Sequence, residues 1–362
     1  ESAEAETDPV AEGGAAEEVR WYYSTLDEEE RHIYDLLLDH ISDMDTETVR
    51  LGITDRERAG QLVWYVLCDH PELFWFGSYS MTAYSLGEET VDLGLGFSYN
   101  CTAEERAEKQ AAVEAAAAAI LADAPESGDY ERIRYVYEYI VLNTDYVTDA
   151  DDSQNICSVF IGHESVCQGY ALAAEYLLQA MGIECAAVSG TARGTDHAWN
   201  IVWADGEPYM MDVTWGDAQY IGEAAETGLY RGISYDYLLV TSAELGTDHT
   251  ASDYLVLPEC TAVEDNYYIR EGLYMTDWDA AAFVRLLQTE IAEGHNGVTV
   301  RFSTYPAYDE AYKDLFEDGH IWSYLHTIDG TEGLDSAICL PRPEEGEESM
   351  MYVIGCEFGS SQ

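Results

Sequence analysis

The sequence contains very few basic residues. It has 16 lysines and arginines against 71 aspartates and glutamates, which gives a formal net charge of −55 at pH 7. A chain this acidic repels phosphate backbones, so nucleic-acid binding is excluded and anionic membrane surfaces are disfavoured. The charge would attract cationic peptides or amines, although a solvated acidic surface that keeps the protein soluble is the simpler explanation. With only two lysines, Lys109 and Lys313, a cross-linking enzyme would have few amines of its own to attack.

Long hydrophobic runs and metal-binding spacings are also missing. No stretch of about 18 apolar residues occurs, so we expect no transmembrane segment. Neither CxxC nor HExxH is present, and Cys157, His163 and Cys167 lack a zinc-site spacing, so we expect no metal and no cofactor. The eight cysteines show no framework spacing, which argues against a disulfide scaffold and leaves the redox compartment open. Five of them suit the role of small buried hydrophobes: Cys68, Cys157, Cys185, Cys260 and Cys339.

The sequence does contain enough apolar residues for a folded protein of two or three domains. The 362 residues are 47% hydrophobic and include 28 tyrosines. Composition and periodicity predict four parts: a disordered acidic linker over residues 1–20, a helical N-terminal region with a short β-hairpin over 21–100, a core over 101–257, and a small α+β module over 258–362. The chain begins with Glu1, so we expect that an upstream segment has been removed, and that the linker tethers an extracellular or cell-surface anchored protein.

The stretch from Glu164 to Asp217 organises the core. Cys167 stands just before an apolar stripe at helical spacing, and Gly182 follows as a left-handed stop. The pattern therefore predicts a helix that begins at Cys167. A thiol at a helix N-terminus lies among unpaired backbone N–H groups and the positive end of the dipole, which favours the thiolate over the thiol.

A β-hairpin is predicted downstream of this helix. HAWNIVWA and EPYMMDVTW flank Asp205-Gly206, a strong signal for a two-residue turn. With that turn, the residue numbers of each cross-strand pair add up to 411, so His197 lies opposite Thr214. Asp212 is then the diagonal neighbour of His197 on the same face, roughly 7–8 Å away at the backbone. A three-residue turn would place them on opposite faces. The hairpin therefore favours a His197–Asp212 pair.

A cysteine, a histidine and an aspartate in this arrangement form a thiol triad. Cys167 is the predicted nucleophile, His197 its general base and later the general acid, and Asp212 the residue that holds the imidazole tautomer. The backbone N–H of Cys167 is expected to bind the oxyanion with one further donor, for which Gln168 and Tyr146 are candidates. Two aromatic residues of the hairpin either wall the cleft or belong to the core: Trp199 and Trp215.

Three motifs in this order, VCQGYA, DHAWNIV and MMDVTWGD, resemble those of the bacterial transglutaminase-like superfamily. The resemblance extends upstream through YIVLNTDY and downstream through YDYLLVTSAEL and DHT, from roughly Tyr130 to Thr250. It implies an α+β fold with a papain-like core and a Cys-His-Asp triad at Cys167, His197 and Asp212. The superfamily includes peptidases, amidases, cross-linking enzymes and inactive members, so it specifies the site better than the substrate.

The predicted activity is acyl transfer from a peptide or amide through a thioester on Cys167. Water as the acceptor gives a peptidase or amidase, and an amine gives a transglutaminase; we favour hydrolysis because the triad alone supplies it. The expected substrate is a peptide or protein, with cell-wall or cationic peptides as candidates. The alternative is an inactive binding or structural surface protein with the same fold. We also expect a loop over 217–232 to flank the site, a strand over 235–240, and a structural role without a partner for His249.

Overall fold

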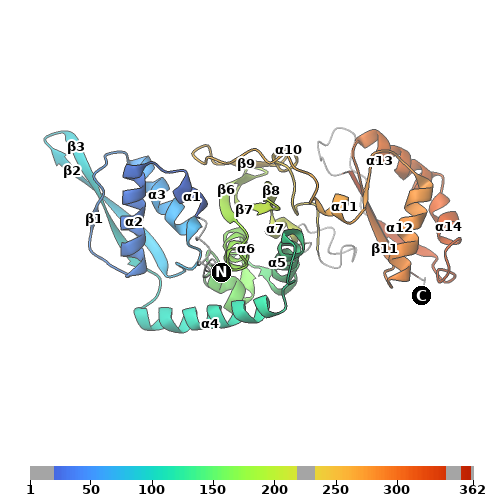
Figure 1. Cartoon of the computed structure of the whole chain (residues 1–362), viewed down its shortest axis with the longest axis horizontal. Helices are drawn as coiled ribbons and strands as arrows, with labels where there is room; N and C mark the ends of the chain where they lie inside the picture. Colours follow the sequence, from blue (N-terminus) through green and yellow to red (C-terminus); the bar gives the residue numbers. More distant parts are fainter. Residues whose placement is uncertain (1–19, 218–232, 340–351, 360–362) are drawn as a thin grey trace, which may run out of the picture.

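The computed structural model describes residues 20–217, 233–339 and 352–359 (Figure 1). Nearly all of the predicted acidic linker and of the predicted loop over 217–232 lies outside these residues. Figure 1 shows the N-terminal region, the core and the C-terminal module in a row along the longest axis of the molecule. No helix among the described residues is long and apolar enough to cross a membrane.

The N-terminal region combines short helices with a three-stranded antiparallel sheet of order β1-β3-β2. Its elements are α1 (Trp21–Ser24), α2 (Glu28–Ser42), β1 (Val49–Arg50), α3 (Arg56–Asp69), β2 (Phe76–Leu86) and β3 (Glu89–Tyr99). Asp27 caps α2 in a capping box with Glu30, and Asp55 caps α3. Both caps are aspartates because a short carboxylate accepts the free N–H groups of the first turn.

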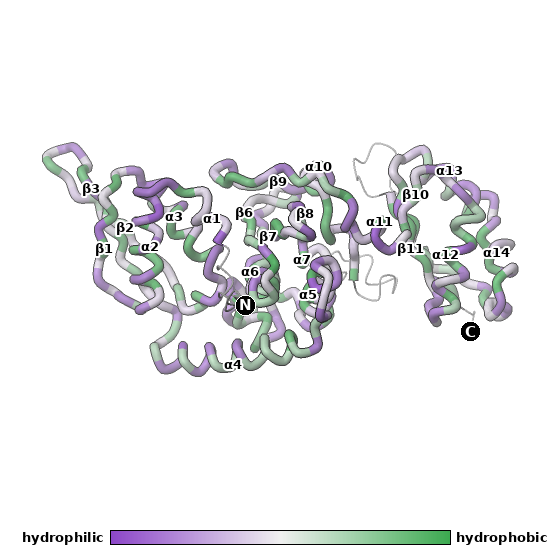
Figure 2. Tube along the Cα trace, viewed as in Figure 1, coloured by the Kyte–Doolittle hydropathy of each residue, from purple (hydrophilic) through white to green (hydrophobic). Residues whose placement is uncertain are grey.

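Two long helices connect this region to the core. Thr102 and Glu105 form a capping box at the start of α4 (Ala103–Ala122), and α5 (Asp129–Asn143) follows after a break at Gly128. Figure 2 shows hydrophobic and hydrophilic colours alternating along α4, in keeping with a helix that buries one face, including Val113 and Ile120.

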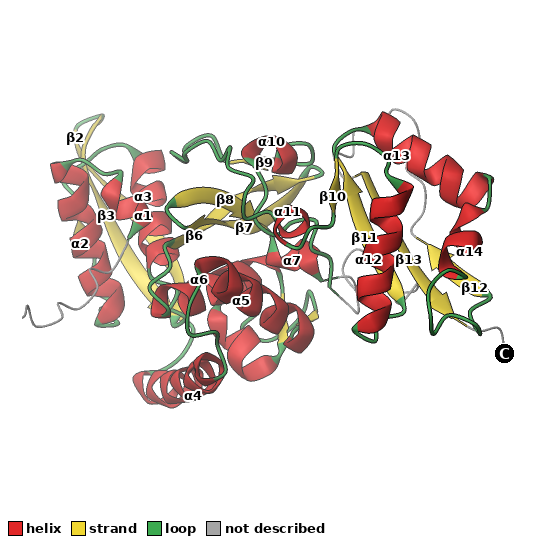
Figure 3. Ribbon diagram, turned by 45° about the vertical axis from the view of Figure 1, so that its right-hand side comes forward, coloured by secondary structure: helices red, strands yellow, loops and turns green. Residues whose placement is uncertain are grey.

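The core is an antiparallel sheet of order β8-β7-β6-β9 with helices packed on it. Figure 3 shows α5 and α6 together on one side of β6, β7 and β8. This confirms the predicted α+β class. The core elements are β4 (Asp145–Tyr146), the π-helical turn η1 (Ser158–Gly162), β5 (Glu164–Ser165), α6 (Cys167–Ala180), β6 (Cys185–Ala192), β7 (Thr195–Ala204), β8 (Glu207–Met211), α7 (Val213–Gly216), α10 (Ser242–Leu245) and β9 (His249–Ala251).

The prediction of a strand over residues 235–240 is wrong. These residues form turns, and Val240 makes only an isolated β-bridge with Met210. Leu239 has a φ of 55°, in the left-handed region that a strand does not use. An apolar run of this length does not by itself distinguish a strand from a buried turn.

The C-terminal module has a second, four-stranded sheet of order β10-β11-β13-β12. Its elements are α11 (Tyr267–Arg270), β10 (Tyr274–Met275), α12 (Ala280–Ala292), β11 (Gly297–Phe302), α13 (Tyr305–Tyr312), the π-helical turn η3 (Lys313–Glu317), α14 (His320–Leu325), β12 (Ser336–Cys339) and β13 (Tyr352–Gly359).

Buried apolar side chains fall into two large clusters. The members of the first cluster lie between Tyr22 and Cys260 in the sequence, so the N-terminal region and the core share one hydrophobic core. The other runs from Met275 to Phe358 within the C-terminal module. The domain boundaries after residues 100 and 257 stay predictions.

Two buried carboxyl groups lie where the N-terminal region meets α6. Asp69 accepts hydrogen bonds from the backbone N–H of Tyr22 (2.9 Å) and Tyr23 (2.8 Å) and from the Tyr34 hydroxyl (2.9 Å). Glu175, on α6, accepts from the Ala187 N–H at 3.0 Å and is fully buried. Burial raises the pKa of Asp69 to about 6 and the pKa of Glu175 well above its usual value.

Because of these two carboxyl groups, we expect the free energy of unfolding to decline as the pH rises. Because their pKa values are higher in the folded state, their stabilising contribution is complete below pH 3.8 and is lost as the pH rises through about 6 and beyond. Glu175→Gln keeps an acceptor for the Ala187 N–H but carries no charge. We expect this variant to match the wild type near pH 4 and to be more stable by about 1–3 kcal/mol at pH 7.

Urea unfolding at pH 4, 5.5 and 7 measures this difference. The control is Glu108→Gln, which replaces an exposed glutamate of α4. If the two variants have the same stability relative to wild type at every pH, the buried carboxyl of Glu175 does not set the pH dependence.

Candidate active site

Cys167 is the first residue of α6, as predicted. Val166 occupies the N-cap position without a side-chain cap, so the side chain of that residue leaves the N–H groups of the first turn free. The Cys167 side chain is half-buried, and its interaction with His197 contributes to the raised pKa of that histidine. The nucleophile expected from the sequence therefore lies near the base expected from the sequence.

The hairpin that carries His197 has the predicted register. Asn200 pairs with Met211 and Ala204 with Glu207, which leaves Asp205 and Gly206 as the two-residue turn. Their φ values are 50° and 87°, and positive values at both positions are those of a type I′ turn. This turn matches the twist of the strands and places His197 near the start of β7.

Asp212 lies one residue beyond the strand on which it was expected. β8 ends at Met211, and Asp212 is the N-cap of α7, where its Oδ1 accepts the Trp215 N–H at 3.1 Å. Its Oδ2 accepts a hydrogen bond from His197 Nε2 at 2.7 Å. The His197–Asp212 pair is therefore present, and the other oxygen of the same carboxylate caps α7.

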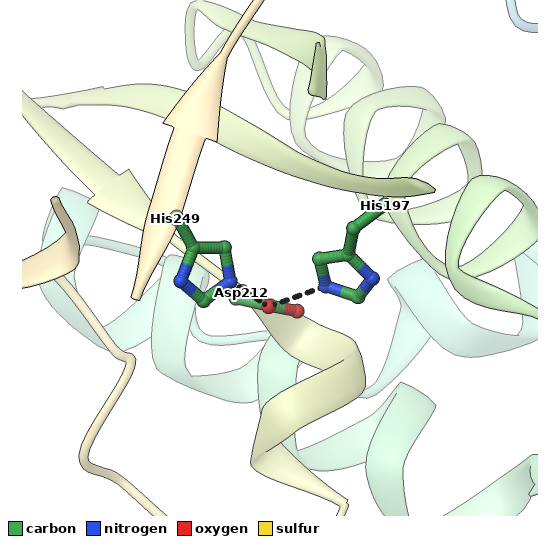
Figure 4. Close-up of side chains that lie close together, drawn as sticks. All are labelled: His197, Asp212 and His249. Atoms are coloured by element: carbon green, nitrogen blue, oxygen red, sulfur yellow. Dashed lines mark hydrogen bonds and ion pairs between the residues drawn. The ribbon is translucent and has the colours of Figure 1, made fainter. Parts of the chain in front are cut away.

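His249 is the residue of the site that the sequence did not reveal. It lies on β9, which pairs with β6, and its Nε2 is 3.0 Å from the same Asp212 Oδ2 (Figure 4). Its Nδ1 is 2.6 Å from Asp248 Oδ1. The expectation that His249 has no partner is wrong. The DHT motif was a signal, but nothing in its spacing indicated that β9 would return to Asp212.

The carboxylate and the two imidazoles stabilise each other's charged forms. Burial alone would raise the pKa of Asp212, but His197 and His249 lower it to about 2. Burial alone would lower the pKa of His197, but the charge and hydrogen bond of Asp212, with a smaller contribution from Cys167, raise it to about 10. The pKa of His249 is raised against the effect of burial by Asp212 and Asp248.

A family comparison agrees with this geometry. The family model described as "Transglutaminase-like superfamily" matches residues 115–213, a segment that includes Cys167, His197 and Asp212. This segment is a transglutaminase-like domain. His249 lies beyond the matched segment.

Two curated relatives match the same chain over a short span. Kyphoscoliosis peptidase of Mus musculus is 27% identical over 105 residues, and that of Homo sapiens is 28% identical over 105 residues. Each match covers 24% of this chain and 16% of the relative, so the chain spans less than a fifth of these relatives. A crystal structure of a TGase is 14% identical, with 47% of this chain and 51% of that chain covered, at a TM-score of 0.28.

Trp199 and Trp215 enclose the two histidines of the site, His197 and His249. Their side chains are buried, with the Trp199 ring 6.2 Å and the Trp215 ring 5.9 Å from the ring of His197. Trp215 also packs edge-on against His249 at 4.6 Å, and the Arg193 guanidinium lies over its outer face at 4.6 Å. The tryptophans thus shield the charged groups from water; a direct contact with substrate stays a prediction.

The two candidate oxyanion donors have different neighbours. Gln168 borders a cavity of about 550 Å³ between the end of α3 and the loop at residues 150–155. Tyr146, on β4, pairs with Ser165 of β5 and packs its ring against Tyr170 at 6.3 Å. Their roles in binding substrate stay predictions.

Two groups of described side chains have the composition of metal sites. In the first, His197, Asp212 and His249, each Nε2 faces a carboxylate oxygen at hydrogen-bonding distance and therefore carries a proton where a metal would bind. The second is Glu290, Glu293 and His295 at the end of α12, where His295 Nδ1 already contacts Glu290 at 2.6 Å. The hydrogen bonds of the first group favour protons over a cation.

Proposed function

We propose that this protein is a cysteine enzyme that transfers the acyl group of a peptide or amide through a thioester on Cys167. His197 accepts the thiol proton and later donates it to the leaving amine, while Asp212 orients the imidazole and stabilises the imidazolium. The Cys167 N–H, at the start of α6, is the first oxyanion donor, and Gln168 or Tyr146 is the candidate for the second.

The observation that carries this proposal is the position of His197 between two partners. Its Nε2 donates to a fully buried Asp212, which leaves Nδ1 as the ring nitrogen for the thiol of Cys167. A structural histidine on a strand has no need of both a buried carboxylate and a thiol at a helix N-terminus. The alternative, an inactive binding or structural protein with this fold, has no substitution in the triad to support it.

Water is the acceptor that we favour. Hydrolysis needs only the triad and an oxyanion site, whereas amine transfer needs a second substrate site. The strongly acidic chain would attract cationic peptides, which makes a basic peptide or a cell-wall peptide the first substrate to test. We further propose an extracellular or cell-surface anchored protein, since such substrates are found there.

Brief alkylation with iodoacetamide tests the nucleophile without knowledge of the substrate. Cys101 and Cys339 are half-buried like Cys167, while the other five cysteines are buried. Because His197 can hold the proton of the Cys167 thiol, we expect Cys167 to react at least about 10-fold faster than Cys101 at pH 6. Peptide mapping of the adducts by mass spectrometry gives both rates.

The matched control is His197→Ala, in which Cys167 should react no faster than Cys101. Equal slow labelling of Cys167 and Cys101 in the wild type would rule out an activated nucleophile and favour the inactive binding protein. Selective labelling without turnover of any peptide would leave the thiol active and direct the search to other acyl donors.

A further inference from the structure

His249 has two carboxylate partners, one for each ring nitrogen. Nε2 lies 3.0 Å from Asp212 Oδ2, and Nδ1 lies 2.6 Å from Asp248 Oδ1. A neutral imidazole has only one N–H, so one of its nitrogens would turn a lone pair toward a carboxylate. The side chain is 1% exposed, which leaves little room for water to relieve that repulsion. The geometry therefore requires the doubly protonated imidazolium.

The charges around His249 balance this buried cation. Asp212 approaches from the N-cap of α7, and Asp248 from the residue before β9. Asp248 is itself bound by the Tyr237 hydroxyl at 3.0 Å and by Arg193 at 3.5 Å. Four rings pack around the imidazole from neighbouring elements: His197, Trp199, Trp215 and Tyr237. A buried charge that has a carboxylate partner on each ring nitrogen is costly to disrupt. Such an arrangement is typical of a residue that orients a neighbouring side chain of the site.

We propose that His249 is a positioning residue of the active site, an imidazolium that holds Asp212 toward His197 and offsets part of its negative charge. This inference rests on the proposed function for its catalytic consequence. Without the His249 charge, nothing would offset the effect of the Asp212 carboxylate on the pKa of His197. The site would also have one positive charge fewer. His197 would then hold its proton more strongly and donate it less readily to the leaving amine.

His249→Gln is the informative variant, because its Nε2 can still donate to Asp212 while the ring charge is gone. We expect kcat to fall about 10- to 100-fold with little change in KM. The limb of the pH–rate profile that reports His197 should move to higher pH, since removal of a positive charge makes the proton of this histidine harder to remove. His249→Asn, whose amide reaches Asp248 but not Asp212, should lose more activity. A purely structural role would lower the active fraction and leave that limb in place.

The protonation state can be tested in protein that has no turnover. In a Cys167→Ala variant labelled with ¹⁵N-histidine, we expect the NMR spectrum to show two ring N–H groups for His249 at pH 7. One N–H at pH 7 would overturn the inference even if the enzyme is active. Two N–H groups in a protein without any acyl-transfer activity would support the imidazolium and contradict only the proposed function.

A second inference concerns Cys339 and Cys356 in the C-terminal module. They are opposite each other in the antiparallel pair β12–β13, and their sulfur atoms lie 2.7 Å apart. The Phe358 N–H donates to Asn296 on the β11 side, so Cys356, two residues earlier on β13, also directs its backbone groups toward β11. The Cys339–Cys356 pair is therefore not hydrogen-bonded across β12–β13. In such pairs the Cα atoms are about 4.5 Å apart, within the range that a disulfide spans.

We infer that these two residues are a site of disulfide formation. Cys339 is half-buried and Cys356 is buried, so an oxidant reaches Cys339 first. The hydrogen bond from Cys356 lowers the pKa of Cys339, which favours its thiolate as the attacking group. With a small dialkyl disulfide as oxidant, Cys339 displaces one thiol to form a mixed disulfide, and Cys356 displaces the second. Two protein thiols and one disulfide thus become one protein disulfide and two small thiols.

Thiol titration in denaturant tests this site in the Cys167→Ala variant after equilibration with oxidised glutathione, because the reactive Cys167 thiol would itself form a mixed disulfide. We expect seven thiols in the reduced variant and five in the oxidised one, with a single cross-linked peptide pair that contains Cys339 and Cys356. Adding Cys339→Ser should leave six thiols and form no intramolecular bond. Seven thiols after oxidation of Cys167→Ala, or a bond between any other pair, would overturn the inference.

Discussion

Replacement of Cys167 by alanine is expected to abolish acyl transfer and to leave the fold intact. Loss of the nucleophile in a triad of this kind lowers kcat by about 10⁴- to 10⁶-fold, because the remaining members cannot act separately. Cys167 is half-buried at the start of α6 and is not one of the fully buried side chains of the cluster, so its loss should change the melting temperature little. Steady-state rates on a peptide substrate and thermal unfolding measure both expectations.

Cys101→Ala is the matched control, since Cys101 is also a free, half-buried cysteine close to the start of a helix, α4. It should keep wild-type activity. Residual activity of Cys167→Ala at the wild-type level would end the thioester mechanism. A large drop in melting temperature would instead assign Cys167 a role in packing.

The geometry of the hairpin could be predicted from the sequence because local chemistry determines it. Asp205-Gly206 is a turn that fixes the register without help from the rest of the protein, and the register in turn brings His197 to the same end of the sheet as Asp212. The apolar stripe that follows Cys167 was similarly sufficient to predict α6. These are features in which each residue's preference agrees with the fold.

The position of His249 could not be predicted, because it depends on contacts between distant parts of the chain. Its strand, β9, pairs with the far end of β6, where Ala192 is opposite His249. The side chain then meets Asp212, 37 residues earlier. Only three residues long, β9 lacks the alternation that would reveal a strand. No local preference specifies such a pairing.

Asp212 was predicted on the second strand of the hairpin, but it is the N-cap of α7, for a related reason. The run EPYMMDVTW alternates well enough to be a strand throughout, but the chain leaves the sheet after Met211. An aspartate followed by Val213, Thr214 and Trp215 also fits a helix cap, and the tertiary structure selects that conformation. The carboxylate still reaches His197, since a residue at the strand end and a residue just beyond it differ little in position.

The variant Asp212→Asn is expected to have the second largest effect. Its Oδ1 can still accept the Trp215 N–H, but an amide in place of Oδ2 cannot balance the charges of His197 and His249. We expect kcat to fall about 10⁴-fold, because the imidazole loses the partner that fixes its tautomer and stabilises its charge. Removal of one member of a buried ion pair also lowers the free energy of unfolding by about 3–5 kcal/mol.

The loss of stability in Asp212→Asn should itself depend on pH. In the wild type the pKa of His197 is raised from 6.5 to about 10, so its stabilising contribution is complete below pH 6.5 and is lost as the pH rises toward 10. The variant lacks that contribution, and the difference in unfolding free energy should therefore be larger at pH 5.5 than at pH 9. Urea unfolding at the two pH values, with Asp145→Asn of the exposed β4 residue as control, measures it. A difference that is equal at both pH values would mean that Asp212 stabilises the fold through the α7 cap and not through the charges of the two histidines.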